Sequence, residues 1–68
     1  MKILDTVALR CDLPEQGLPT GLVGVIVEEW QPGIFEVEFA DLNGHTYAFA
    51  AVAAKDLLPL HHSLGKAA

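Results

Sequence analysis

The sequence predicts an all-β domain, built as a small five-stranded barrel, and two observations carry this prediction. Apolar and polar residues alternate with a period of two along several short segments, which is the pattern of half-buried strands. Glycine and proline separate these segments, and no segment repeats its apolar residues at helical spacing. We expect one domain over residues 1–60 and a flexible C-terminal tail over residues 61–68.

The first strand is expected over residues 5–9, and a long loop follows it over residues 11–21. Two prolines and two glycines within this loop argue against a regular element. Leu13 and Leu18 are expected to fold the loop back over the open end of the barrel. Long loops of this kind in compact domains are often functional.

The second and third strands form the clearest hairpin of the chain. The second is expected over residues 22–30, where Gly24 is typical of a bend or bulge that curls a small barrel. A tight turn at Pro32–Gly33 leads into the third strand, residues 34–39. That strand alternates strictly, with Phe35, Val37 and Phe39 on one face and Ile34, Glu36 and Glu38 on the other.

The last two strands follow a second hairpin turn at Asn43–Gly44, a strong short-range turn signal. The fourth strand is expected from His45 to about residue 51, with Tyr47 and Phe49 facing inward. Residues 53–56 predict a single 3₁₀ or helical turn. The final short strand over residues 57–60 contains Pro59, which is tolerated only at a sheet edge or bulge.

This succession of a strand, a long loop, a three-strand meander, a single turn and a short strand is typical of an SH3-like barrel. The inward-facing positions of its strands should then form one buried cluster. The expected members are Val7, Leu9, Val25, Val27, Phe35, Val37, Phe39, Tyr47 and Phe49.

Charge and composition narrow the classes of partner. The net charge is −5, and Lys2, Arg10, Lys55 and Lys66 are the only lysines and arginines, too few for a stripe that follows phosphates. The charge therefore argues against nucleic acid and favours a neutral or basic partner. A single cysteine, no signal-peptide pattern and no apolar run of about 20 residues predict a cytoplasmic protein without a membrane span.

Several segments together carry a family resemblance: LDTVAL at residues 4–9, DLPEQGL at 12–18, GLVGVIVE at 21–28, PG at 32–33, VEF at 37–39 and DLL at 56–58. The chain resembles a family of small, uncharacterised bacterial proteins over about residues 3–60. The resemblance implies an SH3-like fold and no established activity. It also suggests an immunity or antitoxin role, because members look like short products encoded beside other small, partly toxin-like genes.

The sequence offers little basis for catalysis, a metal or a cofactor. His61 and His62 are adjacent and would point to opposite faces of a strand, and no histidine–cysteine pair has the spacing of zinc ligands. Nothing in the spacing of Cys11 and the histidines brings a nucleophile to a base. We therefore expect no enzymatic activity, no bound metal and no cofactor.

An acidic cluster with one tryptophan is the strongest candidate site, and its members are Glu28, Glu29, Trp30, Glu36 and Glu38. A two-residue turn at Pro32–Gly33 would place Glu29 opposite Glu36, whereas a three-residue turn would place Glu28 there. Opposed glutamates either guard a sheet edge against aggregation or meet lysine and arginine on a partner. Trp30 is either an aromatic anchor for that partner or part of the core.

These observations predict a non-enzymatic protein-interaction module, an accessory or neutralising partner of a neighbouring gene product. The alternative is a nucleic-acid-associated, KOW-like module, because many small SH3-like barrels have that role. A homodimer is also predicted, through the fourth strand or the apolar start of the second. The fourth strand would turn Thr46, Ala48 and Ala50 outward and present small residues to a second copy.

Overall fold

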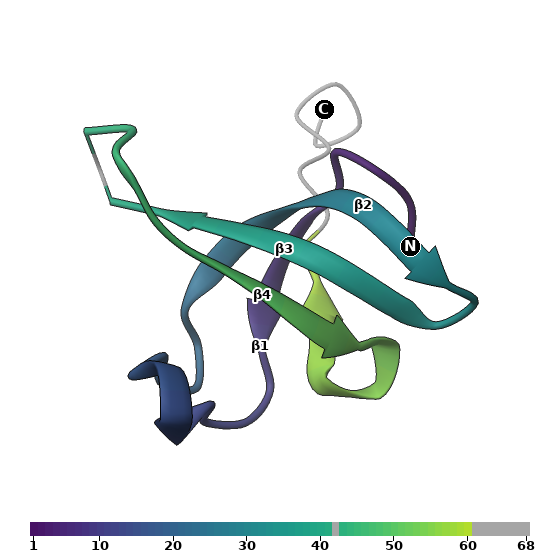
Figure 1. The fold of residues 1–68 in the computed structure, drawn as a ribbon, viewed down its shortest axis with the longest axis horizontal. Helices are drawn as coiled ribbons and strands as arrows, with labels where there is room; N and C mark the ends of the chain where they lie inside the picture. The colour runs from purple at the N-terminus through teal and green to yellow at the C-terminus, as the bar shows by residue number, and fades with distance from the viewer. Residues whose placement is uncertain (42, 61–68) are drawn as a thin grey trace, which may run out of the picture.

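The computed structural model describes residues 1–41 and 43–60 of the chain, without the side chain of Tyr47. Five strands form one antiparallel sheet in the order β4-β3-β2-β1-β5 (Figure 1). They are β1 (Thr6–Leu9), β2 (Val23–Gln31), β3 (Ile34–Ala40), β4 (Thr46–Ala53) and β5 (Leu57–Pro59). The predicted all-β class and SH3-like succession of strands are confirmed. The predicted tail, with His61 and His62, and the predicted inward side chain of Tyr47 lie outside the described part of the chain.

The sheet curls without closing. Figure 1 shows β1 and β5 crossing steeply behind the long β2, β3 and β4 strands. The 3₁₀ turn η2 (Ala54–Asp56) connects β4 directly to β5, as predicted from residues 53–56. In the described part of the chain these two strands are the outer strands of the sheet and do not pair with each other. The predicted barrel is therefore an open one.

The core lies on the concave side of this curled sheet. Its fully buried members include Val7 on β1, Ile26 on β2, and Val37 and Phe39 on β3, each with no exposed surface. The prediction is confirmed for both β1 residues and for all three inward residues of β3. The remaining buried apolar residues are Ala8, Leu9, Leu18, Phe35, Ala50, Val52 and Leu57.

The predicted orientation of β4 is wrong. Phe49, predicted inward, is 52% exposed, whereas Ala50, predicted outward, is 4% exposed and Ala48 packs against the core. Residues that face each other across two strands share a side of the sheet, and Phe39 pairs with Ala48. The large β3 side chains fill the core, so small residues fit opposite them on β4.

The predicted orientation of β2 is also wrong, and Gly24 explains why. Gly24 and Ile26 are buried, whereas the predicted core residues Val25 and Val27 are only half-buried. Gly24 pairs with Phe39, and a Cβ atom there would lie 2.7 Å from the Glu38 carbonyl oxygen. The glycine therefore makes room for the β3 backbone and the Phe39 ring, and the bulges predicted near it lie further along the strand.

The loop between β1 and β2 is tied down along its length, as predicted from its two leucines. Leu13 and Leu18 form a backbone bridge with N–H···O distances of 2.7 and 3.1 Å, and Leu18 is buried in the core. Between them the chain makes one 3₁₀ turn, η1 (Pro14–Gln16), which the sequence did not predict. Proline fits there because the first turn of a helix needs no N–H donor at that position.

Candidate functional site

The β2–β3 hairpin determines how the predicted acidic residues face one another. Its turn has two residues, Pro32 and Gly33, and the positive φ of 84° at Gly33 is easily adopted by glycine. Gln31 and Ile34 pair directly beside the turn, but register shifts leave Val27 and Trp30 as extra residues on β2. A two-residue turn with a bulge therefore produces the pairing expected from a three-residue turn.

That pairing places Glu28 directly opposite Glu36. Glu38, two residues along β3, faces the same side of the sheet, which we call the outer face because it is opposite the core. Glu29 pairs instead with the core residue Phe35, so it belongs to the other side, although its own side chain is exposed. The five predicted residues therefore share one hairpin, which we call the acidic hairpin, but not one face.

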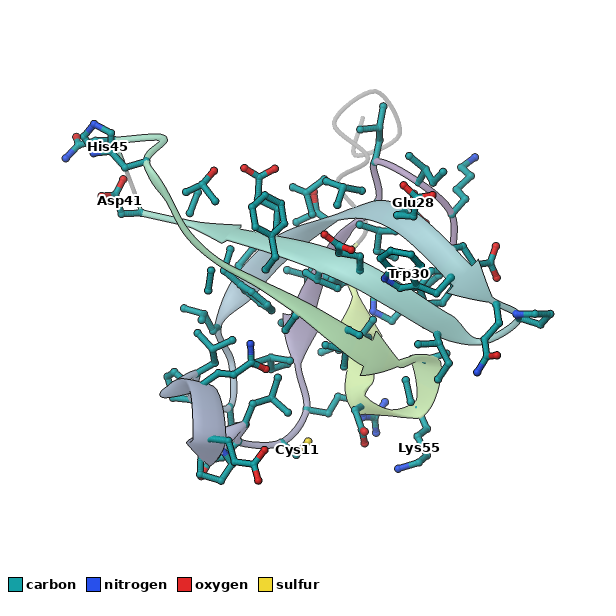
Figure 2. All side chains as sticks on the ribbon, in the orientation of Figure 1. Cys11, Glu28, Trp30, Asp41, His45 and Lys55 are labelled. Atoms are coloured by element: carbon teal, nitrogen blue, oxygen red, sulfur yellow. The ribbon has the colours of Figure 1, made fainter. Side chains whose placement is uncertain are left out.

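Trp30 is not a core residue. Its side chain is 62% exposed at the bulge next to the turn, which removes one of the two alternatives for this residue. Figure 2 shows Glu28 and Trp30 near the same end of the sheet, at the opposite end from Asp41 and His45. A large exposed aromatic ring thus lies beside exposed carboxylates.

The carboxylates of the acidic hairpin have no cationic partner in the described part of the chain. The ion pairs found there join His45 to Asp41 and Lys55 to Asp56. Glu38 accepts a hydrogen bond from the Thr46 hydroxyl of β4. Glu28 and Glu36 face each other without such help, and like charges opposed in this way destabilise a sheet by roughly 0.2–1 kcal/mol.

The structure adds Phe49 to the candidate surface, a residue that the sequence prediction placed in the core. It lies on the outer face of β4 directly opposite Glu38, whose other neighbour across the sheet is Val25 on β2. An exposed aromatic ring therefore flanks the acidic hairpin on the β4 side as well. The sequence signal that could have identified Phe49 as exposed was the Asn43–Gly44 turn. This turn sets which β4 residues lie opposite the inward-facing residues of β3.

Two other carboxylates hold loops. Asp12 accepts hydrogen bonds from the Thr20 backbone N–H at 2.7 Å and from the Thr20 hydroxyl at 2.8 Å, and these bonds lower the pKa of Asp12. At the turn after β3, the backbone N–H of His45 chiefly lowers the pKa of Asp41. A carboxylate with a lowered pKa stabilises the fold above its usual pKa, and this contribution is lost as pH falls through the lowered value.

No cluster suited to a metal is present among the described residues, since no three histidine, cysteine, aspartate or glutamate side chains gather there. Cys11 is half-buried, and Figure 2 shows it on a different part of the molecule from His45. A small open hollow lies beside Leu13, Pro14, Glu15 and Gln16. None of the helical turns in residues 1–41 and 43–60 has the length and apolar character to cross a membrane.

The fold and this surface define a small all-β domain with SH3-like strand order and an acidic, aromatic hairpin. Within that class, residues 3–59 match the model of a family described as a domain of unknown function (DUF4926). The match covers most of the chain, so the protein belongs to this family, which confirms the resemblance to a family of uncharacterised domains. Comparison with curated proteins and with solved structures found no significant match.

Proposed function

We propose that this domain is a non-enzymatic protein-interaction module and that it binds its partner through the acidic hairpin. The observation that carries the proposal is the pairing of Glu28 with Glu36, without a cation beside either in the described part of the chain. Such a pair costs folding free energy. Lysine or arginine side chains of a partner would turn the same pair into an attraction.

The chemistry of the surface supports a basic protein as the partner. Exposed Trp30 supplies the large aromatic side chain that commonly anchors a protein interface, and the glutamates around it supply complementary charge. With a net charge of −5, the whole chain would also speed association with a basic partner. A small acidic domain of this kind suits an accessory or neutralising role toward the product of a neighbouring gene in the cytoplasm.

Charge variants inside and outside the hairpin test the proposal. The double variant Glu28→Gln/Glu36→Gln removes the opposed charges, and Glu15→Gln removes one charge from the exposed η1 turn outside the hairpin. The domain and both variants are used as bait in a lysate of the source cells, and captured proteins are quantified by mass spectrometry. We expect a basic protein to be captured by the unmodified domain and by Glu15→Gln, and to be lost with the double variant.

The captured protein is then purified and its association rate with the domain is measured at two salt concentrations. A rate that falls with added salt for the unmodified domain, and less so for the double variant, supports recognition by charge. Equal capture by all three baits contradicts the proposal. Fluorescence anisotropy with labelled oligonucleotides at low salt tests the alternative, because binding there would indicate a nucleic-acid module instead.

A further inference from the structure

The two outer strands of the sheet differ in how well they are protected from pairing with another chain. β5 has three residues and contains Pro59, which lacks an N–H donor. β4 has eight residues, Thr46–Ala53, and none of them is charged or proline. The half of β2 that extends past β1 is protected by its bulges and glutamates. β4 therefore presents the one long edge that lacks these protective features among the described strands.

A hydrogen bond to Phe49 shows which backbone groups of β4 point to the free edge. The Gln16 side-chain amide donates to the Phe49 carbonyl oxygen at 3.1 Å, so this carbonyl points away from β3. The N–H and C=O of one strand residue point to the same side, and the direction alternates along the strand. The backbone groups of Phe49 and Ala51 are therefore directed outward, and Gln16 covers one of them.

We infer that β4 pairs antiparallel with β4 of a second copy, which extends the two sheets into one continuous sheet. In the register that fits the side chains best, a two-fold axis passes beside Ala50. The backbone groups of Phe49 then bond those of Ala51 in the second copy, and the reverse, and the Ala51 N–H of the second copy replaces the Gln16 amide at the Phe49 carbonyl. Each exposed Phe49 ring lies beside the small Ala51 side chain of the other copy, so neither ring meets its twin.

A second copy fits this edge better than a basic partner does. The chain carries nine acidic residues, but none lies on β4, so two β4 strands meet without opposed charges in the paired segment. The edge also offers no carboxylate that a lysine-rich strand would recognise. This pairing is separate from the proposed function, because the acidic hairpin is formed by β2 and β3, whereas the pairing uses the edge of β4 that faces away from β3. The glutamates of the hairpin therefore stay open in each copy.

Sedimentation velocity over a concentration series and amide hydrogen exchange test this inference. We expect a dimer at high micromolar concentration and a monomer on dilution. The Phe49 and Ala51 amides should exchange slowly in the dimer and quickly in the monomer, because a free edge leaves them open to water. The amides of Ala50 and Val52, which point toward β3, should stay protected in both states.

Matched lysine variants on the two edges locate the interface. Ala51→Lys puts a charge on the β4 edge, opposite Glu36 in the same sheet, so the fold should be retained. We expect it to raise the dimer dissociation constant about tenfold or more. Leu58→Lys, at a 46% exposed residue of β5, is the control and should leave the constant unchanged.

A monomer at every concentration overturns the inference. So does a dimer that Ala51→Lys leaves intact, or one whose Phe49 and Ala51 amides exchange as in the monomer. Because the acidic hairpin is not involved, Glu28→Gln/Glu36→Gln should retain the dimer. Partner capture and dimerisation are thus tested separately. Loss of capture in that variant supports the proposed function, and a dimer that remains intact in it supports this inference.

Discussion

The two halves of β2 have opposite environments within one continuous strand. In the first half, Gly24 and Ile26 are buried, and the strand pairs with β1 on one side and β3 on the other. The pairing with the N-terminal segment ends at Ile26, whose N–H and C=O bond Asp5 and Leu4 at 3.0 and 2.7 Å. In the second half, every residue from Glu28 to Gln31 is exposed. Here β2 pairs with β3 and, within the described part of the chain, with no strand on its other side.

This difference separates the part of the hairpin that stabilises the fold from the part that is free to bind. The first half pairs with β3 without a register shift, and at Gly24 the close packing against β3 leaves no room for a Cβ atom. The second half contains both bulges and three exposed residues of the acidic hairpin. Bulges there cost little core packing and turn side chains away from the sheet. Substitutions in each half should therefore separate a loss of stability from a loss of binding.

Ile26→Ala should have the largest effect on stability. Ile26 has no exposed surface and packs in the centre of the core, so its truncation leaves a cavity. We expect a loss of about 2–5 kcal/mol, a large share of the stability of so small a domain. Urea unfolding followed by circular dichroism measures it, with Val23→Ala, at an exposed position of the same half, as the control.

Gly24→Ala should be nearly as damaging, although it adds only one methyl group. The new Cβ atom would lie 2.7 Å from the Glu38 carbonyl oxygen and 2.8 Å from a carbon of the Phe39 ring. Because one of these neighbours is backbone, the sheet itself must shift, and overpacking of this kind costs about 1–3 kcal/mol. An unchanged unfolding midpoint in Gly24→Ala would show that β2 and β3 are not closely packed at this point.

Glu36→Gln should raise stability slightly. The substitution keeps the size of the side chain and removes the repulsion between Glu36 and Glu28, a gain of a few tenths of a kcal/mol up to about 1. Thermal unfolding at low salt measures the gain, which should shrink when salt is added. Glu15→Gln carries the same charge change outside the hairpin and should show a smaller effect. A lower melting temperature for Glu36→Gln would contradict the claim that repulsion between Glu28 and Glu36 destabilises the fold.

Trp30→Ala should have the smallest effect on folding and a large one on binding. The side chain is 62% exposed, so we expect a stability change within about 0.5 kcal/mol. The association of the domain with its captured partner should nevertheless weaken, as expected for an aromatic anchor. Isothermal titration calorimetry with that partner measures the change. If Trp30→Ala destabilises the fold as much as Ile26→Ala does, the division of β2 into two roles is wrong.

Residue pattern alone was enough to predict most of the fold. β3 alternates large apolar residues with glutamates, so only one orientation buries Phe35, Val37 and Phe39. Proline and glycine marked the turn at Pro32–Gly33 and the long loop, and the apolar pair Leu13 and Leu18 predicted how that loop closes. These features are local, because turn geometry and period-two burial depend on residues close together in the chain.

Tertiary packing decided the orientation of β4 and of the first half of β2. Both strands have apolar residues on each side, so their own pattern leaves the inward face undecided, and side-chain size was a misleading guide. The inward face had to be the one whose small residues fit opposite the core side chains of β3: Gly24 and Ala48 pair with Phe39, and Ala50 pairs with Val37. The Asn43–Gly44 turn contained a clue to the orientation of β4. If this turn has two residues, it pairs Phe39 with Ala48 and so places Ala48 on the core side.

The candidate site shows the same division. Sequence alone identified the glutamates and Trp30, because charge and a lone tryptophan are visible in the residues themselves. Which glutamates face each other depended on the bulge at Trp30, and the exposure of Phe49 depended on how β4 packs against β3. A one-residue shift moves every side chain of a strand to the other face. The charged residues of the surface and Trp30 could therefore be identified from sequence, whereas the fit between neighbouring strands decided the geometry of the surface and added Phe49 to it.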